Sequence, residues 1–127
     1  MSEIVLKVIN ENFVVQPGKW VNTSWTIRED QSAIVNIRYD NNSSKDKDID
    51  LKISDDKFEE IFDLLEKAKL HDSKIFALDG DGWEFIQYKD GKKVYYRRSG
   101  YIYGLDYFEL LAELLYKIIK PYAGKVR

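Results

Sequence analysis

Apolar and polar residues alternate with a period of two along the first part of the chain, which predicts β-strands. Three segments have this pattern: residues 4–9, 24–30 and 32–40. The short polar stretch that joins the second and third segments predicts a hairpin. We expect Trp25, Val35 and Ile37 to lie on the buried face of the sheet, and a further short strand to cover residues 49–53.

After Ser54 the apolar spacing changes from two residues to three or four, which predicts an α-helix. The apolar positions of this helix are Phe58, Ile61, Phe62, Leu65 and Ala68. Ser54 and the two aspartates after it are typical of a helix N-terminus, because a hydroxyl caps free N–H groups there and acids interact favourably with the helix dipole. A second helix is predicted to begin near Asp106 and to end at Pro121, which cannot continue it.

Between the two helices, two alternating segments flank the pair Asp90-Gly91. This dipeptide is typical of the tight turn in a β-hairpin. Trp83 and Phe85 share one face of the first strand and are expected to be buried. Strands interrupted by single helices predict an α+β fold: an antiparallel β-sheet of about five to six strands with two helices packed on one face. A length of 127 residues, without an internal repeat or a linker, is that of a single domain over residues 1–127.

The composition narrows the function classes. The formal net charge is −2 and the pI is near 5.5, so the whole molecule has no general attraction to nucleic acid or anionic lipid. The absence of cysteine excludes disulfides and thiolate metal sites. The N-terminal residues carry early charges and do not resemble a signal peptide, and no apolar run has the length of a membrane helix. We therefore expect a cytoplasmic protein.

Few residues point to catalysis. His71 is the only histidine, and its predicted place at the C-terminal end of the first helix is one that the helix dipole favours for a cation. No phosphate-binding glycine motif or nucleophile–histidine set is present. Asp79 and Asp81 lie in a Gly-rich turn that lacks the remaining ligands of a calcium loop. The sequence therefore predicts no catalytic residue, no metal and no cofactor.

Two charged surfaces are candidates for binding a partner. The first predicted helix carries an acidic stripe on its outer face, composed of Glu59, Glu60, Asp63 and Glu66. Such a stripe could meet a basic protein by electrostatic steering, although a solvated helix surface also has this pattern. The alternative surface is on the hairpin of residues 83–104, where cations lie among tyrosines: Lys92, Lys93, Tyr95, Arg97 and Arg98. Aromatic residues beside cations are typical of single-stranded nucleic-acid-binding proteins, whereas lysines at a hairpin tip also protect a sheet edge.

The last helix is apolar around most of its circumference, since its polar residues form one narrow stripe. An ordinary surface helix needs an apolar arc of only about 100°. Either the rest of the protein covers this helix on two sides, or part of it contacts another chain. We expect partial self-association as a homodimer, with Tyr107, Leu110 and Leu114 as contacts.

The order of these parts resembles a diffuse group of small, uncharacterised bacterial α+β domains. In that group a helix precedes a D-G-x-W strand, a D-G hairpin follows and a final helix closes the chain. The resemblance covers roughly residues 23–119 and rests on the segments SWTIREDQSAIVNIRYD, LKISDDKFEEIFDLLEKAKL, LDGDGWEFIQYKDGKK and DYFELLAELLYKI. Members often have a proline before the last helix, where this chain has YIYGLDY. The resemblance implies the fold and brings no activity with it.

The sequence leaves three possible classes of function. The first is a non-enzymatic protein-binding domain of bacterial type, such as an immunity-like protein that blocks a basic toxin by covering it. The second is a single-stranded nucleic-acid-binding domain that uses the hairpin. The third is a small enzyme whose site contains only carboxylates and tyrosines. The first interpretation is favoured, because a small, acidic, cysteine-free domain without catalytic groups suits that role.

Overall fold

The computed structural model describes residues 2–12, 20–39, 46–70, 81–99 and 106–123. These residues form six strands and two helices. In chain order the elements are β1 (Ile4–Asn12), β2 (Trp20–Arg28), β3 (Ser32–Tyr39), β4 (Lys47–Lys52), α1 (Asp55–Leu70), β5 (Asp81–Lys89), β6 (Lys92–Ser99) and α2 (Asp106–Ala123). His71 and Asp79 lie outside the described residues, as do residues 100–104 of the predicted hairpin segment.

All six strands belong to one antiparallel sheet with the order β4-β3-β2-β1-β5-β6. The hairpins β2–β3 and β5–β6 confirm the two turns predicted from the sequence. Strand β1 lies between them, pairing with β2 on one side and with β5 on the other. The N-terminal strand therefore joins two hairpins that are far apart in the chain.

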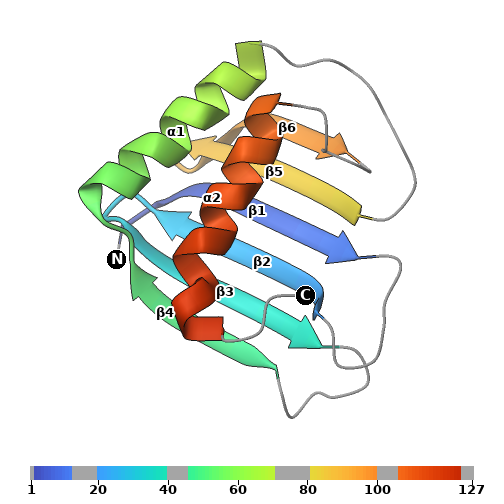
Figure 1. Ribbon diagram of the computed structural model, residues 1–127. Helices are drawn as coiled ribbons and strands as arrows, with labels where there is room; N and C mark the ends of the chain where they lie inside the picture. Colours follow the sequence, from blue (N-terminus) through green and yellow to red (C-terminus); the bar gives the residue numbers. More distant parts are fainter. Residues whose placement is uncertain (1, 13–19, 40–45, 71–80, 100–105, 124–127) are drawn as a thin grey trace.

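Both helices cover the same face of the sheet (Figure 1). Helix α2 lies across the middle of that face, and α1 packs beside it, near the ends of β2 and β5. The predicted α+β fold, with an antiparallel sheet and two helices on one face, is confirmed. The residues predicted to be buried on that face are all in the core: Trp25, Val35, Ile37, Trp83 and Phe85.

Local signals in the sequence account for several ends of elements. At the start of α1, the Ser54 hydroxyl accepts a hydrogen bond from the Lys57 N–H at 3.4 Å, and the Ser54 carbonyl accepts one from the Phe58 N–H at 2.9 Å. In the β5–β6 turn, Asp90 and Gly91 have positive φ angles of 53° and 77°. Two consecutive positive φ angles give the turn whose twist matches that of the adjoining strands.

The structure covers α2 on two sides, by the sheet and by α1. Phe108, Leu111, Leu115 and Ile119 are buried, and so is Leu114, which is 5% exposed. The expectation that Leu114 is a dimer contact is therefore wrong, because this side chain is already packed inside one copy of the chain. The helix also continues through Pro121 to Ala123, two residues beyond the predicted end. Within the part of the chain that is described, neither helix combines the length and apolar character that a membrane span requires.

Candidate functional site

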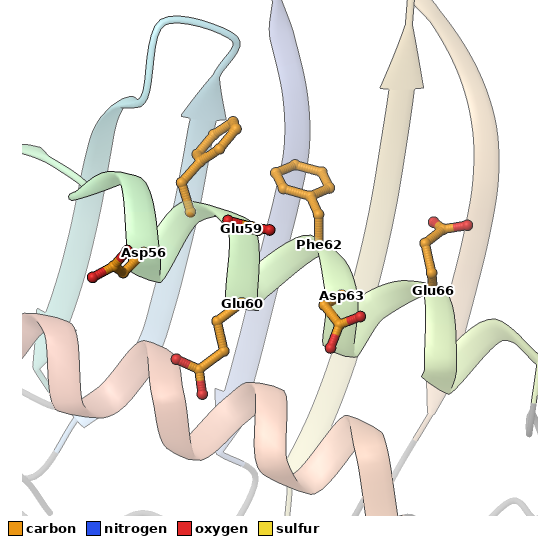
Figure 2. Close-up of a pocket in the computed structure, with 7 residues that line it drawn as sticks. Asp56, Glu59, Glu60, Phe62, Asp63 and Glu66 are labelled. Carbon is orange, nitrogen blue, oxygen red and sulfur yellow. The ribbon is translucent and has the colours of Figure 1, made fainter.

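The acidic residues predicted on α1 are all exposed, and all four line one shallow hollow on the outer side of the helix. Figure 2 shows Phe62 and Glu66 pointing to the same side of α1, while Glu60 points to the opposite side. Glu59 is exposed and lies away from the buried face of α1, to which Ile61 belongs. The side chains point in different directions around this hollow, and the acidic surface adjoins the aromatic residues Phe58 and Phe62.

Lysines on the same helix neutralise part of this acidic surface. The Lys57 ammonium lies 4.0 Å from the Glu60 carboxylate. The ammonium groups of Lys67 and Lys69 lie 3.0 Å from the Asp63 carboxylate and 3.1 Å from the Glu66 carboxylate, respectively. Hydrogen bonding to the Asp63 carboxylate raises the pKa of Lys67, one of these partners. Such exposed pairs contribute little stability and exchange readily with other partners. Six acidic and three basic residues leave α1 with a net charge of −3.

Glu59 is the one predicted acid that has no ion pair within the described residues. It lies next to Phe58, whose ring centroid is 5.0 Å from that of Phe62. Both phenylalanines are only partly buried, so they present aromatic surface beside the acids. A carboxylate next to exposed aromatic rings is suited to a cationic group that also makes apolar contacts.

A shallow groove continues from the two phenylalanines to the ends of the strands. Its apolar surface comes from Val5, Phe58, Phe62, Tyr88 and Val94. Its charged and polar residues are Glu29, Glu66, Lys69, Gln87 and Lys89. The groove therefore lies between α1 and the ends of four strands, β2, β1, β5 and β6.

Two β-bulges supply the valines of this groove. Ile4 and Leu6 of β1 lie opposite adjacent residues of β2, so that Val5 is the extra residue. In the same way, Val94 is the extra residue of β6, because its two neighbours lie opposite the adjacent residues Gln87 and Tyr88. A bulge interrupts the alternation of a strand and turns a side chain from its regular direction. The two valines consequently line the groove beside α1.

Lys69 fixes the position of the end of α1 against the sheet. Its ammonium donates hydrogen bonds to the Glu66 carboxylate at 3.1 Å and to Gln87 Oε1 at 2.9 Å. It also lies 5.2 Å from the centre of the Tyr95 ring. This charge is therefore engaged inside the protein, in contrast to the carboxylate of Glu59.

The residues predicted for nucleic-acid binding lie in three different environments. Lys92 and Lys93 are exposed near the turn. Arg98 is exposed on the face that no helix covers, 4.0 Å from Glu84. Tyr95 and Arg97 point to the helix-covered face, where desolvation raises the pKa of Tyr95 and lowers that of Arg97. The five side chains therefore do not form one continuous basic and aromatic surface.

Arg97 contributes to the core of the fold. Its side chain is 8% exposed, and its guanidinium lies 4.8 Å from the centre of the Phe108 ring. A guanidinium over an aromatic face is a favourable cation–π contact. This packing of β6 against α2 makes Arg97 unsuited to bind a nucleic acid by its charge.

A second group of polar residues lies under α2. The Asn10 amide donates to the Gly82 carbonyl at 3.1 Å, and the Tyr116 hydroxyl donates to Asn10 Oδ1 at 3.2 Å. Asn10 and Tyr116 line an enclosed cavity of about 10 Å³ together with Thr23 and Trp83. Such a volume is that of a single water molecule, so the cavity is too small for a substrate or cofactor.

The described residues contain no group of three or more His, Asp or Glu side chains that could hold a metal ion. Asp81 begins β5, and the other residue of the predicted Gly-rich turn, Asp79, is outside the described part. The predicted absence of a metal and of a catalytic residue stays a prediction.

Sequence patterns did not identify the groove. Phe58 and Phe62 share the helical spacing of the apolar positions of α1, but they are only partly buried, and the buried residues of the helix are Ile61, Leu65 and Ala68. No signal was available for Val5 and Val94, because a bulge depends on the pairing of strands.

In comparisons with known proteins, no family model matches this chain, and no curated protein sequence matches it.

Proposed function

We propose that this chain is a non-enzymatic protein-binding domain that docks a basic partner on the outer side of α1. The observation that carries the proposal is the exposed carboxylate of Glu59 beside the partly exposed pair Phe58 and Phe62. Aromatic residues dominate the binding energy of many protein interfaces, and complementary charge accelerates association. The net charge of −3 on α1 adds to the attraction for a basic protein.

A bacterial immunity-type protein is the particular role that these features support. Such a protein acts by covering a toxin, so it needs an exposed recognition surface and no catalytic group. A basic toxin, for example a nuclease, would be attracted by the acidic side of α1. This role also places the protein in the cytoplasm, where it would meet the toxin.

Self-association is a separate proposal. Leu114 is buried, so the contacts that remain for a homodimer are Leu110, which is 46% exposed, and the partly buried Tyr107. The sheet and α1 already cover most of the apolar surface of α2. A homodimer is therefore not required to explain the apolar composition of this helix.

The test measures association rates with a basic partner isolated on the immobilised protein. The variant Glu59→Lys with Asp63→Lys is compared with a variant of Glu11, an exposed acid near the far end of β1. We expect the double variant to slow association about tenfold at low salt and much less at high salt, because salt screens long-range attraction. Glu11→Lys should have a small effect. Equal association rates for the wild type and the double variant at low salt would refute the proposal.

The same purified protein also tests the alternative function, which is the binding of single-stranded nucleic acid by the hairpin. A fluorescent single-stranded oligonucleotide is titrated with the wild type and with Lys92→Glu/Lys93→Glu. Salt-dependent binding that the double variant abolishes would favour the hairpin as the functional surface. We expect no such binding, because Arg97 is packed on Phe108 and Arg98 is on the opposite face.

A further inference from the structure

The groove beside α1 has the properties of a site for one apolar side chain. Phe58 and Phe62 form one wall, and the bulged residues Val5 and Val94 extend the apolar surface across the strand ends. Val94 is 53% exposed, although it is a large apolar residue. A bulge interrupts the sheet ladder, and bulges commonly redirect a side chain next to a functional site.

Two carboxylates lie close to this apolar surface. Glu29, the residue that follows β2, lines the groove together with Phe58 and Phe62. Glu59 borders the same two rings on the outer side of α1. Neither carboxylate has an ion pair within the described part of the chain. Both are therefore available to cationic groups of a partner.

The positive charges of the groove are at its other end. Lys69 is engaged by Glu66 and Gln87, and Lys89 is at the end of β5. Glu29 thus lies at the β2 end of the groove, while Lys69, with its partner Glu66, and Lys89 lie toward β5. A bound segment would place its basic residues beside Glu29 and Glu59, on either side of the phenylalanines.

From this arrangement we infer that the groove receives a single aromatic or large aliphatic side chain from a protein segment whose flanking residues are basic. The inference rests on the proposed function and names the contact that gives it affinity. The phenylalanines and valines hold the apolar side chain, while Glu29 and Glu59 pair with the flanking lysines or arginines. A few desolvated apolar anchors commonly supply most of the affinity of such an interface.

The test uses three synthetic peptides and methyl NMR spectra of the whole protein. The first peptide is Ac-Arg-Lys-Gly-Phe-Gly-Lys-Arg-amide, the second has Gly in place of Phe, and the third keeps Phe but has Glu and Asp in place of its basic residues. We expect the first peptide to shift the methyl signals of Val5 and Val94 and to bind roughly tenfold more tightly than either of the others, as one anchor contact or one set of charge pairs suggests.

A matched pair of variants locates the binding. Val94→Asn removes apolar surface from the groove, and Ile34→Asn removes it from a residue that is 39% exposed on the uncovered face of the sheet. Both positions are exposed, so that both variants should fold. The affinity of the first peptide should fall at least fivefold for Val94→Asn and stay within twofold for Ile34→Asn.

The outcomes separate this inference from the proposed function. If the Phe and Gly peptides bind equally and Glu59→Lys weakens both, the groove holds no anchor and the inference is wrong, while the acidic surface is retained. If no basic peptide binds, or if Glu59→Lys changes nothing, both proposals are wrong. If the Phe peptide shifts the methyl signal of Ile34 rather than those of Val5 and Val94, the inference is also wrong.

Discussion

Leu110 and Leu114 lie one turn apart on α2 and have opposite environments. Leu110 is 46% exposed, whereas Leu114 is 5% exposed in the core between the sheet and the helices. Each of the two leucines follows a glutamate and precedes a leucine, so the change to alanine should affect helix propensity to a similar extent. The difference in the free energy of unfolding between Leu114→Ala and Leu110→Ala therefore measures how completely the fold covers α2.

The expected magnitudes follow from the burial of the two side chains. Leucine to alanine removes three carbon atoms, which corresponds to about 2.4 kcal/mol of transfer free energy when the side chain is fully buried. The cavity left at a packed site raises the cost, so Leu114→Ala should lower the free energy of unfolding by about 3 kcal/mol. About half of the Leu110 side chain is in water already, and no closed cavity forms there. Leu110→Ala should therefore lower the free energy of unfolding by about 1 kcal/mol.

The measurement is equilibrium unfolding in urea, followed by the fluorescence of the buried residues Trp25 and Trp83. With a slope of about 1.5 kcal/mol per molar urea, the midpoint should fall by about 2 M for Leu114→Ala and by about 0.7 M for Leu110→Ala. Sedimentation of both variants shows whether their masses differ. Equal losses of stability, or a larger loss for Leu110→Ala, would refute the structural assignment of the two faces of α2.

Two further predictions concern polar groups. Tyr116→Phe removes the hydroxyl that donates to Asn10 Oδ1 at 3.2 Å, and urea unfolding should show a loss of about 1 kcal/mol; the control Tyr122→Phe, at a residue 56% exposed on the same helix, should lose almost nothing. Hydrogen bonds from the Ser32 hydroxyl and N–H lower the pKa of Asp30 from 3.8 to about 2. Because the folded-state pKa is below the unfolded value, the carboxylate stabilises the fold above about pH 4, and this contribution is lost as the pH falls to about 2. The difference in urea midpoint between wild type and Asp30→Asn should therefore shrink over that range, and a constant difference would contradict the assignment.

The candidate site was only partly visible in the sequence. The exposure of Glu59, Glu60, Asp63 and Glu66 follows from helical spacing, because these positions lie away from the buried stripe of α1. Their pairing with lysines three or four positions away needed side-chain positions. The groove next to Phe62 could not be foreseen, since it also requires the ends of four strands.

Local chemistry determined where most elements begin, end and turn. The Ser54 hydroxyl starts α1, and the Asp90-Gly91 pair makes the β5–β6 turn, because both depend on backbone preferences within a few residues. The period of two also identified the buried face that contains Trp25, Val35 and Ile37. These features are independent of the rest of the fold, and the sequence by itself was sufficient to determine them.

Contacts between distant segments were decided by the tertiary structure alone. Strand β1 lies between β2 and β5, with Leu6 opposite Gln87, a pairing that no local preference specifies. The pairing of β5 with β6 produces the bulge at Val94, and the packing of Phe108 on β6 buries Arg97, a residue whose type predicts exposure. The burial of α2 on two sides likewise requires that both α1 and the sheet pack against it. Each of these outcomes depends on the combined free energy of many long-range contacts, which the order of residues along one segment does not contain.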